Sequence, residues 1–280
     1  MNYELMYILW NPDLVICHLG PLAIRWYSTF WLIGLLSSYL MVRYIYQKLK
    51  IPEEKFEPLF IYCFLGILIG ARLGHCLFYE PGYFLSSGTH IIEMLLPIRQ
   101  DYMGGWHFTG YEGLASHGGT IGIIIAILLY CHNQKVKVWT VLDTISIAVP
   151  ATACCIRMGN LMNSEIIGKV TDVPWAFIFE RVDMMPRHPG QLYEAMAYFC
   201  FGIVLWLLWR KRPDRIGTGF FFGLDILLIF LFRFFIEYTK EIQEAFEASL
   251  PLDMGQILSI PFILIGLYFT IKGWQKKMAN

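Results

Sequence analysis

The sequence has little charge and few of the motifs that soluble enzymes carry. Charged residues make up 16% of its 280 residues, whereas soluble domains carry about 25%. Lys and Arg equal Asp and Glu at 22 each, so no charge excess points to nucleic acid. The seven cysteines form no CxxC pair, which argues against a metal site or a disulfide framework. The chain has no GxSxG element, and its first ten residues lack the basic region of a cleaved signal peptide.

Hydrophobic sequence takes the place of charge. Hydrophobic residues make up 56% of the chain, and the mean hydropathy is +0.51. A membrane-spanning helix needs about 20 apolar residues. Seven runs approach that length, at 26–46, 57–79, 118–132, 138–157, 190–209, 217–238 and 254–273. The sequence therefore predicts an all-α, polytopic membrane helical bundle that forms a single integral membrane domain over residues 1–280.

Positive charge is distributed unevenly between the loops. If all seven runs cross the membrane, thirteen Lys and Arg residues fall on one side: Arg43, Lys48, Lys50, Lys55, Lys135, Lys137, Arg210, Lys211, Arg212, Arg215, Lys272, Lys276 and Lys277. Cytoplasmic loops are enriched in Lys and Arg, so we expect the N-terminus outside and the C-terminus in the cytoplasm. The two long connections, 80–117 and 158–189, then lie on the outer face, where we expect a small periplasmic head region that carries function.

Two arginines lie inside the apolar runs, Arg72 in the second and Arg233 in the sixth. A charge at the bilayer centre costs about 2.5–3.5 kcal/mol on insertion scales, so such residues usually face the protein interior and serve a function. The alternative for Arg233 is a structural ion pair with Glu237, four residues later. The alternative for Arg72 is a side chain that reaches the membrane interface.

A denser polar group ends the fourth run. Arg157 is followed by Asn160, Asn163 and Glu165, and the spacing of three places the first three on one helical face if the helix continues. A guanidinium binds phosphate oxygens in a bidentate way, and amides can fill the remaining positions. The pattern indicates a site for a phosphate or another polar headgroup. A polar helix end with capping residues is the alternative.

Three further segments hold candidate residues. His117 lies between glycines in GLASHGGTIG and could act as a general base near neutral pH, although a histidine taken alone is more often structural. The segment RHPGQLYEA contains Pro189, which predicts a helix start, and Arg187, a polar group at the outer interface. Tyr27 lies at the outer end of the first run, and the residues alone leave its role open.

Together these segments resemble the prolipoprotein diacylglyceryl transferase family, bacterial enzymes that lipidate lipoprotein precursors. The matching stretches follow the family's order over nearly the whole chain: IRWYSTFWLIG, IGARLGHCLFYEP, GLASHGGTIG, IRMGNLMNSEIIG, RHPGQLYEA, FRFFIEY and MGQILSIP. The element R-x-G-N-x-x-N-x-E followed by R-H-P-x-Q-L-Y-E is highly specific. Two positions depart from the family's pattern: this chain has Ser116 where an aromatic residue often precedes the histidine, and Ile229 where some members have tyrosine.

The resemblance implies site residues by position. The catalytic residues that it implies are His117, Arg157, Arg233 and Tyr27, and the phosphatidylglycerol-binding residues are Arg157, Asn160, Asn163, Glu165 and Gly168. It implies no cofactor and no metal. The implied partners are phosphatidylglycerol, prolipoprotein signal peptides with a lipobox cysteine, and the lipid bilayer of the bacterial cytoplasmic (inner) membrane.

The activity that the resemblance implies is the first step of lipoprotein maturation. The diacylglyceryl group of phosphatidylglycerol moves to the lipobox cysteine thiol, a thioether forms, and glycerol phosphate leaves. We expect His117 or a neighbour to take the thiol proton, because the thiolate is the nucleophile. We expect Arg157 and Arg233 to neutralise the departing phosphate. A carboxylate, Glu165 or Glu237, could orient an arginine.

Two other classes of protein are considered. Intramembrane arginines suit a transporter or flippase for an anionic lipid equally well on physical grounds, but such a protein would move its substrate without covalent change. An intramembrane protease would cleave peptides, and no nucleophile motif supports one. The resemblance favours the transferase over both.

Overall fold

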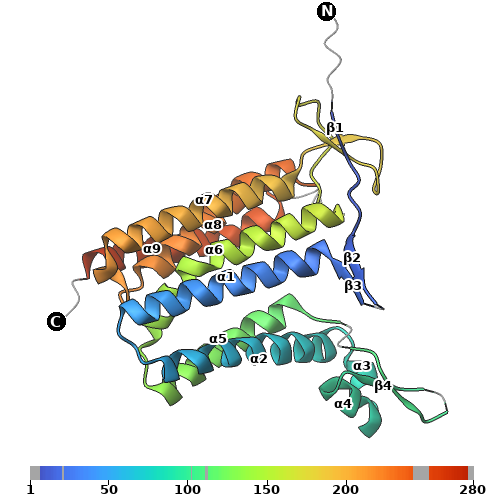
Figure 1. Cartoon of the computed structure of the whole chain (residues 1–280), viewed down its shortest axis with the longest axis horizontal. Helices are drawn as coiled ribbons and strands as arrows, with labels where there is room; N and C mark the ends of the chain where they lie inside the picture. Colours follow the sequence, from blue (N-terminus) through green and yellow to red (C-terminus); the bar gives the residue numbers. More distant parts are fainter. Residues whose placement is uncertain (1–6, 21, 102, 111–112, 242–251, 277–280) are drawn as a thin grey trace, which may run out of the picture. The chain divides into compact units, whose positions relative to one another are not determined.

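The computed structural model describes residues 7–20, 22–101, 103–110, 113–241 and 252–276 (Figure 1). Lys277, which the positive-charge count includes, lies outside these residues. The described chain is mostly helical. Contacts divide it into two compact units, Met1–Ile45 with Leu142–Asn280, and Tyr46–Val141, and each unit is described by itself. The single integral membrane domain therefore stays a prediction.

Each predicted apolar run contains a long helix. These helices are α1 (Trp26–Lys48), α2 (Glu53–Phe78), α5 (Ser116–Gln134), α6 (Val138–Asn163), α7 (Gly190–Lys211), α8 (Phe220–Ile236) and α9 (Met254–Gln275). By length and composition, α1, α2, α6, α7 and α9 could cross a membrane. The helix α5 has 19 residues and α8 has 17. A polytopic helical fold is confirmed, whereas the number of seven spans and the orientation of the termini stay predictions.

Short elements occupy the connections. The helical ones are α3 (Pro81–Phe84), α4 (Gly88–Leu95), η1 (Pro213–Arg215) and η2 (Glu237–Thr239). The strands are β1 (Ile8–Trp10), β2 (Val15–Leu19), β3 (Leu22–Arg25), β4 (Ile98–Gln100), β5 (Trp106–Phe108), β6 (Phe177–Phe179) and β7 (Pro186–Arg187). They form a sheet of order β1-β6-β7 and two hairpins, β2-β3 and β4-β5. The fold is thus not purely α-helical, because these segments of two to five residues pair their backbones in pieces too short for a periodic sequence signal.

The second unit, Tyr46–Val141, depends on close contact between α2 and α5. A Cβ atom added at Gly122 of α5 would come within 2.0 Å of the Gly66 carbonyl oxygen, and one at Gly118 within 2.2 Å of the Gly70 oxygen. Only glycine allows backbones to approach this closely, as is common between membrane helices. The glycines of both helices therefore set the distance between them.

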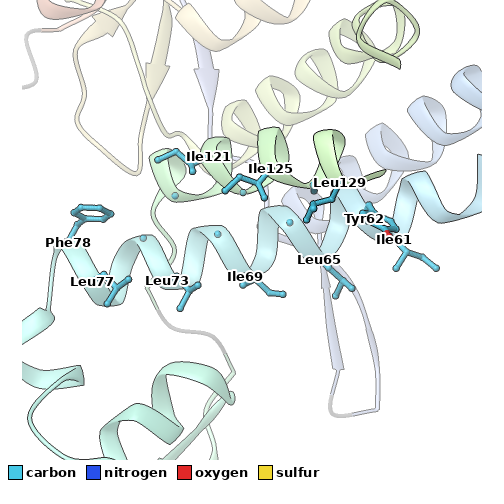
Figure 2. Close-up of a pocket in the computed structure, with 16 residues that line it drawn as sticks. Ile61, Tyr62, Leu65, Ile69, Leu73, Leu77, Phe78, Ile121, Ile125 and Leu129 are labelled. Carbon is cyan, nitrogen blue, oxygen red and sulfur yellow. The ribbon is translucent and has the colours of Figure 1, made fainter. Parts of the chain in front are cut away.

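An apolar groove of about 490 Å³ runs along α2 and α5 (Figure 2). Isoleucine and leucine side chains from both helices form its walls, and glycines of both helices also line it. Tyr62 supplies the hydroxyl group among the lining residues. The groove is a hydrocarbon-like surface, and its end at Gly118 lies next in sequence to His117.

In the first unit, α7, α8 and α9 run side by side (Figure 1). A buried carboxylate near the start of α6, the end of the helix that is farther from Arg157, fixes the start of α8. Asp143 of α6 accepts hydrogen bonds from the backbone N–H groups of Gly217, Gly219 and Phe222, at 2.8, 2.9 and 2.9 Å. A helix start has unpaired N–H groups and a positive dipole end, so this carboxylate acts as its cap from a neighbouring helix.

The Gly122→Ala variant tests the contact between α2 and α5. Its added methyl group would overlap the Gly66 backbone, and overpacking costs typically about 1–3 kcal/mol. We expect a lower thermal unfolding midpoint for the purified protein in detergent micelles. Gly82→Ala is the matched control, because a Cβ at Gly82 would meet no atom within 4 Å. Equal midpoints for the two variants would show that the contact does not determine stability.

Candidate functional site

The helix α6 continues past Arg157 to Asn163, so the predicted polar face forms. The Arg157 Nη1 group donates to Asn160 Oδ1 at 3.4 Å. Asn160 Nδ2 and Asn163 Nδ2 each donate to one carboxylate oxygen of Glu165, both at 3.0 Å. These four side chains form one hydrogen-bonded chain that leads from the guanidinium to the exposed Glu165 carboxylate.

A strained turn returns Glu165 toward the helix end. Its neighbours Ser164 and Ile166 have φ angles of 57° and 56°, in the left-handed region. For a β-branched residue such as Ile166 this conformation is unusual, and strain of this kind costs about 1–3 kcal/mol. Gln191, which is fully buried, holds the turn by donating from Nε2 to the Glu165 carbonyl oxygen. Backbone strain held by a buried side chain is typical of functional sites.

Glu194 of α7 is the buried carboxylate at the centre of the site. Its side chain is 1% exposed, and Arg157 Nε lies 2.9 Å from its Oε2 atom. Lys240 Nζ lies 3.0 Å from its Oε1 atom and 3.4 Å from Glu237 Oε2. One carboxylate thus pairs with two cations, and Lys240 joins the two carboxylates.

Arg157 uses only part of its guanidinium in these contacts. The group has five N–H donors in a planar fork. Within the described part of the chain, it contacts Glu194 at Nε, Asn160 at Nη1 at the long distance of 3.4 Å, and the Tyr198 side chain through a hydrogen bond. These three contacts do not use all five donors, and the planar fork matches the geometry of a phosphate.

Arg233 belongs to the same unit, and the ion pair with Glu237, which was the alternative interpretation of this arginine, does not form between these two described residues. The backbone still has helical geometry at Glu237, whose N–H group donates to the Arg233 carbonyl, so helical spacing alone does not decide the pairing. Glu237 instead lies beside Lys240. The Tyr198 phenol of α7 is close enough to interact electrostatically with both Arg157 and Arg233, which relates the two arginines to one region.

Tyr27 contacts the same helix as the polar chain. A Cβ atom at Gly159 of α6 would lie 2.9 Å from Tyr27 Cδ2 and 3.3 Å from its Cα atom. The tyrosine therefore packs on a glycine that lies between Arg157 and Asn160 in the sequence. This contact places Tyr27 next to the site.

Gly168 acts through its backbone. Its N–H group donates to the His188 carbonyl oxygen at 2.9 Å, and an added Cβ atom would lie 2.6 Å from that oxygen and 2.7 Å from the Thr239 oxygen. Its own carbonyl accepts from Arg187 at 3.2 Å. Gly168 thus allows three backbone segments to meet, including the one that leads to Lys240.

Arg187 anchors the segment between α6 and α7. It is buried, and it donates to Asp183 Oδ1 and to Glu241 as well as to Gly168. These bonds to the guanidinium lower the pKa of the Asp183 carboxyl.

The N-terminal strand also contacts this segment. Ahead of the first helix, β1 pairs in parallel with β6, and Trp10 Nε1 donates to the Leu161 carbonyl at 2.9 Å.

His117 belongs to the second unit. It is the second residue of α5, and its side chain is exposed. The loop before it is tied to α2, because the Ala115 N–H group donates to the Ala71 carbonyl at 2.9 Å. Gly113 packs on His75, where a Cβ atom would lie 2.1 Å from Nε2. The helix start that carries His117 is therefore held in place.

Arg72, the other intramembrane arginine, has structural partners. It is buried, and it donates to the carbonyls of Glu93 at 2.8 Å and Met94 at 3.3 Å. Its guanidinium carbon lies 4.9 Å from the centre of the Phe84 ring. Arg72 thus holds α3 and α4 against the end of α2.

Sequence reasoning missed Glu194, Lys240 and Gln191. The signal for Glu194 was present, since it is a carboxylate inside a predicted span with no basic residue one helical turn away. Glu194 and Gln191 both lie in RHPGQLYEA, where the prediction considered only the polar helix start. As for metals, no group of three His, Cys, Asp or Glu side chains suited to an ion occurs among the described residues.

A multi-pass helical membrane protein with an arginine–carboxylate centre at the ends of its helices is the class that this geometry defines. The chain belongs to the prolipoprotein diacylglyceryl transferase family, whose sequence profile matches residues 14–272. It is 57% identical over 280 residues, all of both chains, to a phosphatidylglycerol–prolipoprotein diacylglyceryl transferase of Bacteroides fragilis. It is 40% identical to the enzyme of that name in Tolumonas auensis, covering 96% of this chain and 99% of the relative. For the Porphyromonas gingivalis enzyme of that name the identity is 39%, with coverage of 95% and 94%.

Replacing Glu194 by Gln tests the shared carboxylate. The change leaves Arg157 and Lys240 without their common anion, and breaking a buried ion pair from one side costs about 3–5 kcal/mol. We expect a marked fall in thermal stability in detergent micelles. Glu180→Gln is the control, since Glu180 is exposed and accepts a surface bond from Asn11.

A double-mutant cycle with Lys240→Met separates the pair from other effects. Residues in direct contact show interaction energies of about 0.5–3 kcal/mol, so we expect the double variant to lose less stability than the sum of the single changes. Strictly additive losses would contradict a direct pair between Glu194 and Lys240.

The Asp183–Arg187 pair predicts acid sensitivity in residues 168–188. Because the folded pKa of Asp183 is lowered, its contribution is complete above the unfolded value of about 3.9 and is lost as the pH falls through the folded value. Amide hydrogen exchange of this segment, corrected for intrinsic rates, should be faster in Asp183→Asn than in the parent at neutral pH. The two should converge once the pH has fallen through the folded pKa of Asp183, and a difference that persists at the acid end of the titration would contradict the assignment.

Proposed function

We propose that this chain transfers the diacylglyceryl group of phosphatidylglycerol to the lipobox cysteine of a prolipoprotein, and that Arg157 holds the lipid phosphate. The names of its relatives supply the two substrates. The cysteine thiolate attacks the glyceryl carbon, so that a C–S bond forms and the C–O bond to phosphate breaks. The electron pair of the broken bond leaves on the phosphate oxygen, and glycerol phosphate departs.

The geometry of Arg157 is the observation that carries this proposal. Glu194 engages Nε at 2.9 Å and so fixes the orientation of the guanidinium plane. Asn160 meets Nη1 only at 3.4 Å, so the guanidinium keeps donor capacity for a departing phosphate. Charge-assisted hydrogen bonds in a site with little water stabilise the developing negative charge more than they would in water.

Three cations, Arg157, Arg233 and Lys240, share this region with the carboxylates Glu194, Glu237 and Glu165. Lys240 lies beside both Glu194 and Glu237, so the two arginines are the cations left to meet an anionic substrate. We assign Arg233 as the second phosphate contact, and Lys240 as the cation that keeps Glu194 in place.

The signature residues after Arg157 have positioning roles in this proposal. Asn160 links Arg157 to Glu165, and its 3.4 Å contact with the guanidinium is weak enough to exchange for a phosphate oxygen. Asn163 supports the same carboxylate. Gly168 contributes by admitting the backbones of His188 and Thr239.

We assign His117 or a neighbour as the base that takes the thiol proton. His117 is the second residue of α5, and its imidazole is exposed to a substrate. The loop before it is fixed to α2, so the imidazole is presented from a rigid support. Tyr27, which packs on Gly159, is assigned to the lipid side of the reaction.

The membrane topology is part of the proposal. We infer that α5 and α8 complete seven spans, with the N-terminus outside and the C-terminus in the cytoplasm of a bacterial cytoplasmic membrane. The accumulation of Lys and Arg in alternate loops supports this orientation. In it, Arg157 and the segments 80–117 and 158–189 face the side on which an exported lipoprotein precursor presents its cysteine.

Single substitutions test the assigned residues. Arg157→Ala and His117→Asn proteins would be assayed with phosphatidylglycerol vesicles and a lipobox peptide, with the mass of the peptide as readout. Loss of one group that acts in the transition state lowers the rate by about 10²–10³. We expect losses of this size for both variants.

Matched controls are Arg25→Ala and His18→Asn, because both residues are exposed and neither belongs to the site. These variants should transfer at the rate of the parent protein. Near-normal transfer by Arg157→Ala or by His117→Asn would remove that residue from the mechanism. A parent protein that moves the lipid but never adds mass to the peptide would instead support a flippase.

A further inference from the structure

The connection between α2 and α5 ends in a hairpin with two chemically different faces. In β4-β5, Ile98 pairs with Phe108, Gln100 with Trp106, and Arg99 with His107. Alternate residues of a strand point to opposite faces, and paired residues share a face. One face therefore carries Ile98, Trp106 and Phe108 with Gln100, and the other carries Arg99 and His107.

The apolar face is exposed within the described chain. Phe108 is 78% exposed, Trp106 is 43% exposed, and Met103 at the hairpin turn is 96% exposed. The neighbouring helix α4 adds exposed apolar side chains of its own, Ile92 and Leu95. A contiguous exposed apolar surface of this kind marks an interaction site rather than a surface in water.

Hydrogen bonds made by Arg72 and Glu93 connect the hairpin, through α4, to the end of α2. Arg72 donates to the carbonyls of Glu93 and Met94, both in α4. The Glu93 carboxylate, 2% exposed, accepts from Tyr83 at 2.8 Å and from the Gln100 N–H group of β4 at 2.9 Å. The orientation of β4 thus depends, through α4, on α2, which has the length and composition of a membrane span.

The ends of this connection limit what its apolar face can meet. The helix α2 ends at Phe78, which is 78% exposed, and α5 begins at Ser116. A connection that leaves a spanning helix and returns into the next apolar helix is held close to the membrane surface. Interfacial elements have one apolar and aromatic face, with basic side chains on the other face. The β4-β5 hairpin has this pattern in full.

We infer that the β4-β5 hairpin inserts the face formed by Met103, Trp106 and Phe108 into the lipid headgroup and upper acyl region of the bilayer around α2. His107, on the other face, lies toward water. The hairpin is a membrane-docking element, separate from the Arg157 site.

Site-directed spin labels test this placement in the full chain. A variant with the seven native cysteines replaced, and with transfer activity retained, would carry one new cysteine: Met103→Cys, Phe108→Cys or His107→Cys. Each labelled protein is reconstituted into phosphatidylethanolamine–phosphatidylglycerol vesicles. Collision of the label with oxygen, which partitions into lipid, is compared with collision with a water-soluble nickel chelate.

Labels at positions 103 and 108 should collide with oxygen and be shielded from nickel, whereas the label at the adjacent position 107 should show the reverse. Position 107 is the matched control, because it shares the strand and differs only in the face. Exposure of 103 and 108 to nickel would overturn the inference, since the face would then lie in water. Shielding of both from oxygen as well as nickel would also overturn it, because protein rather than lipid would cover the face.

Discussion

The pairing of one buried carboxylate with two cations is the interaction on which the site depends. Glu194 comes from α7, Arg157 from α6, and Lys240 from the chain that follows α8. None of these charges is stable alone in an apolar environment, because each would lose its hydration without gaining a partner. The requirement to pair therefore joins three parts of the chain, and it also gives Arg157 the orientation that the proposed chemistry uses.

The helices within each unit are held together by contacts of a different kind. Between α2 and α5, and again between α8 and α9, glycines let backbones meet where any side chain would overlap; a Cβ at Gly223, for example, would lie 2.4 Å from the Thr270 nitrogen. Lipid gives no hydrophobic force that brings helices together, so close packing and buried polar bonds must supply the stability. The Asp143 cap and the Glu194 pairs are such bonds, one near each end of α6 and α7.

The sequence was sufficient for the positions of the long helices, because apolar length is a direct consequence of bilayer thickness. It was also sufficient for the polar face of Arg157, Asn160 and Asn163, since helical spacing is local. It could not give the Glu194–Lys240 pair, whose members lie 46 positions apart. The Arg233–Glu237 alternative failed although the spacing is helical, because the Glu237 carboxylate pairs with Lys240 instead. The partners of Arg72 are backbone carbonyls, which have no signature in the sequence.

The contact of Trp10 with the Leu161 carbonyl has a consequence for biosynthesis. The two residues lie 151 positions apart, and at typical synthesis rates the ribosome needs roughly 8 to 30 s to make the chain between them. During that time β1 has no β6 with which to pair, although α1 can already be inserted in the membrane. The strand β1 therefore stays without its partner until the whole of Tyr46–Val141 has been made. Completion of the site is thus a late event, and a newly made chain cannot assemble its Arg157 region before most of its membrane helices exist.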